Sequence, residues 1–253
     1  WRATAVGSGV LIMLVGLPAA QLFRRRPEDH GLMPDGAERT ESTTAGHAPL
    51  NIPGVSTVDF TLAEALRDRS FWFVAMGHGM ALLVVATIPA HVVPHLVERN
   101  GWDTAVAALI FPGIMVMQII GQFAGGYLGD RYSKTVVAAA GTLGHGVALT
   151  ILAFDTSIVS VLIAISLHGL GWGSRGPLMM AIRADYFGRT NLGVIAGWSN
   201  VVTMGGSLVG PVYAGMMYDA RGDYTVAFWT IGVVTIVSAL LFLSARQPPA
   251  PGR

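Results

Sequence analysis

The sequence has no cysteine and only one lysine, Lys134, among its 253 residues. The absence of cysteine excludes disulfides and thiolate metal sites. Charged residues make up 12% of the chain, about half the share usual in soluble domains, whereas hydrophobic residues make up 52%. The formal net charge of +1 argues against nucleic acid as a partner. So little charge is typical of a protein whose outer surface faces lipid.

The sequence also lacks acidic residues well inside its long apolar segments. A helix needs about 20 mostly apolar residues to cross the hydrocarbon core of a bilayer. Seven segments meet this condition, and the sequence therefore predicts an all-α, polytopic membrane protein in contact with the lipid bilayer. The expected spans are Ala3–Phe23, Phe71–Val97, Thr104–Gly129, Thr135–Phe154, Ile158–Ile182, Leu192–Met217 and Tyr224–Ser244.

The spacing of these segments divides the chain into parts. We expect one membrane helix, a long polar loop, a bundle of six membrane helices and a short tail. Trp1 leads directly into an apolar segment without a basic leader or a cleavage site, so we expect a piece of a longer protein. The predicted boundaries are 1–23 for the first helix, 24–69 for the loop, 70–245 for the bundle and 246–253 for the tail.

The end of the polar loop carries a helix signal. Thr61 and Glu64 have the spacing of a capping box. We expect a short interfacial helix over Asp59–Arg69, with an ordinary loop helix as the alternative. Its predicted apolar face consists of Phe60, Leu62, Ala63 and Leu66.

The basic residues predict an orientation. The segments between seven spans alternate between the two sides of the membrane. Twelve of the sixteen Lys and Arg residues fall on one side, three on the other, and Arg175 lies within a span. Cytoplasmic segments are enriched in these residues, so the first side and the C-terminus are expected in the cytoplasm, with the protein in the plasma or inner membrane.

A motif occupies the turn between the third and fourth spans. Gly126 is followed by three residues, then Asp130, Arg131, two residues and Lys134. This pattern resembles the signature loop of the major facilitator superfamily, although Ser133 stands where that pattern usually has glycine. A glycine at the position of Gly126 permits close helix packing, and the charged residues can pair across a cytoplasmic gate. The resemblance makes these four residues the expected gating residues.

Three further stretches resemble the branch that holds the monocarboxylate and oxalate–formate carriers. They are residues 24–36, residues 183–188 and residues 218–228. The resemblance implies helix six through helix twelve of a twelve-helix carrier, with residues 24–69 as its central cytoplasmic loop. In that fold, two six-helix bundles rock about a central site, so the missing N-terminal bundle is an expected partner. It implies no cofactor and no metal.

Polar groups deep in a span are costly and suggest function. Arg175 and His168 lie seven residues apart on one predicted helix and share a face, which would suit an organic anion such as a monocarboxylate. The alternative is that Arg175 extends toward the cytoplasmic surface. His78, Gln118 and Asn200 are further candidates for the translocation path, with helix–helix hydrogen bonds as the alternative.

Other polar residues have structural interpretations. His145 falls in a helix that the resemblance makes peripheral, so we expect it to pack. His91 and His95 are expected at the outer membrane interface. The glycines Gly121, Gly125 and Gly129 predict close helix packing.

Two functions compete on this evidence. The first is a secondary transporter of a small solute and not an enzyme, because the spans lack the acids of a catalytic site. The second is a seven-helix receptor or sensor, since the number of spans fits. A retinal protein is excluded because its Schiff base needs a lysine in the last helix, whereas Lys134 lies in a turn.

Overall fold

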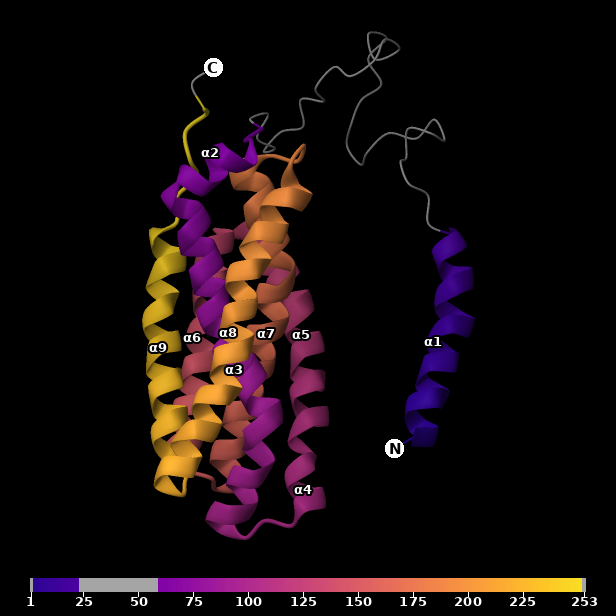
Figure 1. Cartoon of the computed structure of the whole chain (residues 1–253), viewed down its shortest axis with the longest axis vertical. Helices are drawn as coiled ribbons and strands as arrows, with labels where there is room; N and C mark the ends of the chain where they lie inside the picture. Colours follow the sequence, from indigo (N-terminus) through magenta and orange to yellow (C-terminus); the bar gives the residue numbers. More distant parts are fainter. Residues whose placement is uncertain (1, 23–58, 252–253) are drawn as a thin grey trace. The chain divides into compact units, whose positions relative to one another are not determined.

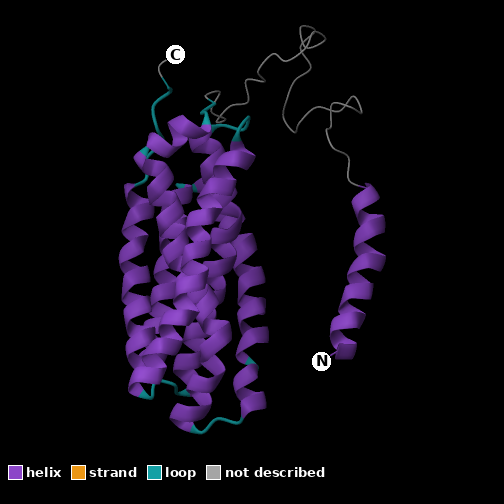
Figure 2. Cartoon of the chain, in the orientation of Figure 1, coloured by secondary structure: helices purple, strands orange, loops and turns teal. Residues whose placement is uncertain are grey.

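The computed structural model describes residues 2–22 and 59–251. All regular structure in these two ranges is α-helical, and the helices are joined by short turns (Figure 2). Residues 1–57 and 58–253 form two separate units. In the first unit, the predicted first span is a helix, α1 (Arg2–Leu22), whose apolar part, Val6–Gln21, is shorter than the six candidate spans of the second unit. Residues 24–58 of the predicted polar loop lie outside the described residues.

The second unit is one bundle of long helices (Figure 1). Six of its helical segments are long and apolar enough to cross a membrane, as predicted. The third predicted span is divided at Leu109, where one short helix ends and a long one begins. The elements are α2 (Leu62–Arg67), α3 (Arg69–Asn100), α4 (Thr104–Ala108), α5 (Ile110–Arg131), α6 (Lys134–Phe154), α7 (Ile158–Phe187), α8 (Leu192–Arg221) and α9 (Thr225–Ser244).

Glycine brings the backbones of neighbouring helices into contact. A Cβ atom added at Gly125 of α5 would collide with the backbone of Ser174 in α7, and one added at Gly206 of α8 would collide with Gly79 of α3. Membrane helices use small residues in this way because lipid supplies no hydrophobic force between them. The predicted packing role of Gly121, Gly125 and Gly129 is confirmed, since all three lie against α7.

The short helix α2 confirms the predicted capping box. The Thr61 hydroxyl accepts a hydrogen bond from the Glu64 backbone N–H, and the Glu64 carboxylate accepts one from the Thr61 backbone N–H. The helix is shorter than the predicted Asp59–Arg69. Asp59 and Phe60 lie outside the helix. The Phe60 backbone N–H donates to the carbonyl of Phe187 at the end of α7, and the Asp59 carboxylate accepts from the backbone N–H groups of Arg189 and Thr190.

The predicted apolar face packs on protein at Phe60, Leu62 and Leu66, and only its fourth member, Ala63, is wrongly assigned. Phe60 and Ala65 are buried in a cluster with residues of α3, α7 and α8, whereas Ala63 is exposed. Phe60 meets Phe187 edge to face at a ring distance of 5.5 Å. The end of the predicted loop is therefore packed onto the end of the bundle.

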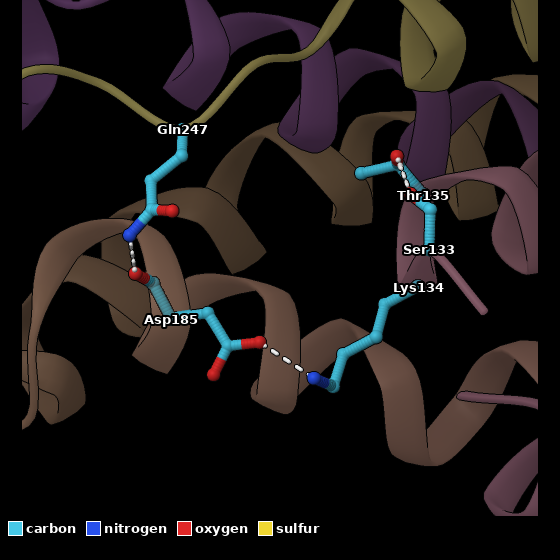
Figure 3. Close-up of polar contacts among 5 residues, drawn as sticks. All are labelled: Ser133, Lys134, Thr135, Asp185 and Gln247. Atoms are coloured by element: carbon cyan, nitrogen blue, oxygen red, sulfur yellow. Dashed lines mark hydrogen bonds and ion pairs between the residues drawn. The ribbon is translucent and has the colours of Figure 1, made fainter. Parts of the chain in front are cut away.

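The same end of the bundle holds the start of the tail. The Ser70 hydroxyl donates to the carbonyl of Arg246 at 2.6 Å, and the Gln247 amide donates to the carbonyl of Asp185 at 3.0 Å. Figure 3 shows Gln247 and Lys134 approaching Asp185 from different sides. These contacts tie α3, α6, α7 and the tail together.

Candidate functional site

Helix α7 carries two buried arginines. Arg175 is 2% exposed and Arg183 is 3% exposed. The sequence predicts a span that ends at Ile182, with Arg183 in the turn after it. That assignment is wrong, because α7 continues to Phe187 and carries Arg183 with it.

Arg183 is well hydrogen-bonded. Its Nε and Nη2 atoms donate to the hydroxyl of Ser199 in α8 at 3.1 and 2.7 Å, and its Nη1 donates to the carbonyl of Met179 at 2.9 Å. Nη2 also lies 3.5 Å from Nδ1 of His78 in α3. Arg183 therefore links three helices.

Arg175 is held much less firmly. Nη1 lies 3.5 Å from the carbonyl oxygen of His78, and Nη2 lies 3.5 Å from Nε2 of His145 in α6. The Nε atom is buried without a hydrogen-bond partner. The guanidinium thus turns inward toward α3 and α6 and does not extend along α7 to the membrane surface.

Neither arginine has an acidic partner in the part of the chain that the structure describes. Among the described residues, the buried polar and charged side chains include no Asp or Glu. The ion pair observed in the described ranges joins Lys134 to Asp185 at the end of the bundle. Two positive charges are therefore buried without a carboxylate to balance them.

Two buried histidines continue the polar chain from Arg175. Nδ1 of His145 lies 3.0 Å from Nδ1 of His168, and the ring centroids are 4.7 Å apart. Trp172 packs beside His168 at 5.9 Å. The expectation that His145 only packs is therefore incomplete, because it joins Arg175 to His168.

The remaining predicted site residues lie outside this series of polar contacts. Gln118 is half-buried, and its backbone carbonyl lies against Gly173 of α7. Asn200 is exposed on α8. His95, expected at the outer membrane interface, has a buried ring, and its Nε2 lies 2.7 Å from the carbonyl oxygen of Leu152 near the end of α6.

The contacts that the structure describes for the signature loop lie within the bundle. A Cβ at Gly126 would meet no atom within 4 Å, so the close approach to α7 is made by its neighbour Gly125. Lys134 pairs with Asp185 of the same bundle at 2.8 Å, with both side chains about one-third exposed (Figure 3). Arg131 covers the ring of Tyr127 at 4.3 Å, and Asp130 is exposed.

At the end of the bundle away from the signature loop, carboxylates accept hydrogen bonds within the turns between helices. The Ser160 hydroxyl donates to Asp155 and lowers the pKa of that carboxyl group. The backbone N–H of Thr225 donates to Asp223 and lowers its pKa. These acids stay charged at the ends of α6 and α8, where they cap turns.

Sequence reasoning missed Arg183, Ser199 and the role of His145. One signal for Arg183 was present. Arg175 and Arg183 are eight residues apart, about two helical turns, and no helix-breaking residue follows Arg183 before Gly188. The partners of these residues come from other helices, and no pattern within one segment predicts them.

The family model described as Major Facilitator Superfamily matches residues 74–253. The gentisate transporter of Corynebacterium glutamicum is 26% identical over 231 residues, which cover 90% of this chain and 48% of that protein. Monocarboxylate transporter 13 of Rattus norvegicus is 23% identical over 151 residues, covering 59% and 35%. The chain spans half the length of these relatives or less.

A solved structure shares the fold. The crystal structure of the transporter FucP in the outward conformation aligns with a TM-score of 0.61 at 22% identity. The alignment covers 74% of this chain and 46% of that one. The likeness therefore extends over most of the six-helix bundle and over about half of the solved chain.

Proposed function

This chain belongs to the Major Facilitator Superfamily, and we propose that it is the C-terminal half of a secondary transporter for small organic anions. It works by alternating access, and it is neither an enzyme nor a seven-helix receptor. In this assignment, α1 is the last helix of an N-terminal bundle and α3 to α9 form the C-terminal bundle.

A second six-helix bundle of the same protein is the proposed partner. In the spans formed by α4–α5 and by α8, only 22% of the most apolar 18-residue stretch is buried within the protein. In the other four spans this share is 44–61%. Lipid can cover the apolar side chains of α4–α5 and α8. It covers the exposed amides of Gln122 on α5 and Asn200 on α8 only at a cost, so these two helices suit contact with a protein partner or a solute path.

The observation that carries the anion assignment is the pair of buried arginines without a carboxylate. An arginine in the middle of a span costs at least about 2.5 kcal/mol on insertion scales. A buried charge without a partner is more costly than a matched one. A carboxylate substrate offsets that cost during binding, when the guanidinium donates two parallel hydrogen bonds to it.

Arg175 is the better candidate of the two for binding the anion. Its two contacts are long, so leaving them costs little, whereas Arg183 has three short hydrogen bonds. Gly176, the next residue, is exposed and has no atom near the position of a side chain. The Arg175 side chain can turn past Gly176 onto the open face of α7.

Helix α7 also has a place to bend. Pro177 lies within it and cannot donate a hydrogen bond to the carbonyl of Gly173. A kink at this point moves Arg175 relative to His145 and His78. The named cargoes of the two relatives, gentisate and monocarboxylates, are carboxylates, which supports the same substrate class.

The signature loop and the arginine distribution complete the proposal. Asp130, Arg131 and Lys134 lie at the end of the bundle that carries α2 and the tail (Figure 1). We assign this end to the cytoplasm of a plasma or inner membrane because it carries most of the basic residues. There the loop contributes to the gate between the two bundles.

Uptake measurements test the proposal. The protein is expressed from its complete reading frame, and sealed vesicles are supplied with radiolabelled benzoate, gentisate or lactate. Benzamide is the neutral control. We expect uptake of at least one carboxylate, weaker uptake in Arg175→Lys, and almost none in Arg175→Gln, because glutamine loses both the charge and the two-pronged geometry.

The matched control is Arg189→Gln, which removes an exposed arginine. Membrane insertion is checked by surface labelling of each variant. Normal carboxylate uptake by Arg175→Gln would refute the anion assignment, and uptake of benzamide as fast as benzoate would refute the substrate class.

A further inference from the structure

Helices α6 and α9 pack side by side (Figure 1), and a groove of about 400 Å³ runs between them. Every residue that lines the groove is Val, Ile, Leu or Ala. Small side chains form its floor, since Ala139 and Ala239 are buried, whereas exposed larger side chains such as Leu143 and Leu243 form its walls. The groove is therefore a hollow in the apolar surface of the bundle.

The groove reaches one end of the bundle. Its lining residues on α6 run from Val136 to Leu143, which spans about 10 Å along the helix. Val136 is the third residue of α6, and Leu243 is the last but one of α9. The ends of membrane helices lie near the level of the lipid headgroups. The groove therefore opens where the hydrocarbon of a lipid meets its headgroup.

The open end of the groove carries an unbalanced positive charge. Lys134 begins α6, but its ammonium group is paired with the carboxylate of Asp185. Arg246 lies three residues beyond Leu243 and is exposed, and within residues 2–22 and 59–251 no carboxylate pairs with it. The sequence itself has no acidic residue after Asp223. Arg246 thus supplies a free guanidinium at this end.

These features match the two parts of an anionic phospholipid. An acyl chain fits an apolar hollow, and the guanidinium of arginine binds phosphate through two hydrogen bonds. Lipid surrounds the protein, so the hydrophobic effect gives no preference for the groove. Van der Waals contact with a hollow of matching shape and attraction to the cation supply it instead.

We propose that the groove between α6 and α9 binds one anionic phospholipid, with an acyl chain against Ala139 and Ala239 and the phosphate on Arg246. This inference goes beyond the transport function and does not depend on Arg175. The carbonyl of Arg246 accepts a hydrogen bond from Ser70 of α3. A lipid held at Arg246 therefore lies beside the contact that ties the tail to α3.

Native mass spectrometry of the full-length protein tests the site, because it counts the lipids that remain bound. The protein is titrated with dioleoylphosphatidylglycerol, with dioleoylphosphatidylcholine, or with glycerol 3-phosphate as a headgroup without chains. We expect the first phosphatidylglycerol to bind roughly tenfold more tightly than the first phosphatidylcholine, as one charge-assisted contact would give. Glycerol 3-phosphate alone should not bind.

Two variants address the two parts of the site. Ala140 is an exposed lining residue, so Ala140→Phe fills the groove without disturbing the core and should abolish the selective binding. Leu162→Phe, at an exposed position of α7 outside the groove, is its control and should bind as the wild type does.

The charge is tested separately. Arg246→Gln should lower the affinity for phosphatidylglycerol to that for phosphatidylcholine. Its control is Arg221→Gln, which removes an exposed arginine at the other end of the bundle and should leave the preference unchanged.

Each contrary result has a clear meaning. Equal affinity of the wild type for both lipids would show general lipid cover and overturn the proposal. Selective binding that persists in Ala140→Phe overturns the groove assignment, and selectivity that persists in Arg246→Gln overturns the phosphate contact. A wild-type dimer that Ala140→Phe converts to a monomer with no loss of lipid would show that a second copy occupies the groove. None of these results bears on the proposed transport function.

Discussion

The two arginines of α7 lie on one helix and are buried to the same degree, yet their surroundings differ. Around Arg183, a serine hydroxyl and a backbone carbonyl accept three hydrogen bonds of 3.1 Å or less. Around Arg175, two contacts lie at 3.5 Å and one nitrogen has no partner. The guanidinium of Arg183 is therefore well hydrogen-bonded, and that of Arg175 is not.

The difference separates structure from function. A buried polar group left unsatisfied costs free energy, so a protein keeps one only where something else is gained. Functional sites often carry such costs, and substitutions that remove them can stabilise the fold while abolishing activity. We therefore assign Arg183 to holding α7 against α8 and Arg175 to ligand binding.

The largest effect is expected from moving α7 itself, since both arginines depend on its position. Leucine at Gly125 would collide with the backbone of Ser174, so Gly125→Leu should prevent folding. Gly126→Ala is the matched control because no atom lies near its new methyl group. Size-exclusion profiles of tagged protein measure both. A monodisperse Gly125→Leu protein would show that α5 and α7 do not pack as described.

The next largest loss of stability is expected when Arg183 loses hydrogen bonds. Ser199→Ala removes the acceptor of two Arg183 hydrogen bonds and should destabilise the protein by about 2 kcal/mol, because the buried guanidinium loses its partner. Ser238→Ala, which removes a buried hydroxyl bonded only to a local carbonyl, should cost less. Thermal unfolding in detergent compares them. Equal losses would contradict the structural role of Arg183.

A smaller effect of opposite sign is expected for Arg175. Replacing a buried, poorly matched charge by an apolar side chain is often stabilising, so Arg175→Met should raise stability by about 1 kcal/mol. Uptake should be lost in the same variant. A clear fall in melting temperature would mean that Arg175 is held by its surroundings as Arg183 is, and the comparison would fail.

The smallest change in stability is expected at the bundle end. The Lys134–Asp185 pair is partly exposed, so Lys134→Gln should cost roughly 0.5 kcal/mol or less. Asp130→Asn should also leave stability unchanged while lowering transport rate more than substrate affinity, because a gate residue shifts a conformational equilibrium. Wild-type turnover in Asp130→Asn would make the loop a simple connector.

The sequence was sufficient for the helices and for some of their contacts. Hydropathy predicts each long helix because the bilayer sets its length, and the capping box at Thr61 is a local signal. The span that begins at Ile158 is predicted to end at Ile182 because two charged residues, Arg183 and Asp185, follow closely. Lipid-exposed helices end there, but α7 is sheltered by its neighbours and continues past Arg183.

The polar chain could only partly be predicted. The shared face of Arg175 and His168 follows from helical spacing, whereas the meeting of His145 with both depends on which helices are neighbours. Which helices are neighbours is decided by the tertiary structure and cannot be read from any one segment of the sequence. The same limit explains Gly126, whose place in a motif suggested close packing that its neighbour Gly125 makes instead.

The most direct test of the account is whether a carboxylate binds through Arg175. A ligand that binds the folded state raises its melting temperature by an amount that grows with affinity and with ligand concentration. Benzoate, gentisate or lactate should raise the melting temperature of the wild-type protein, raise it less in Arg175→Lys, and leave Arg175→Gln unchanged. A shift in Arg175→Gln as large as in the wild type would contradict the account.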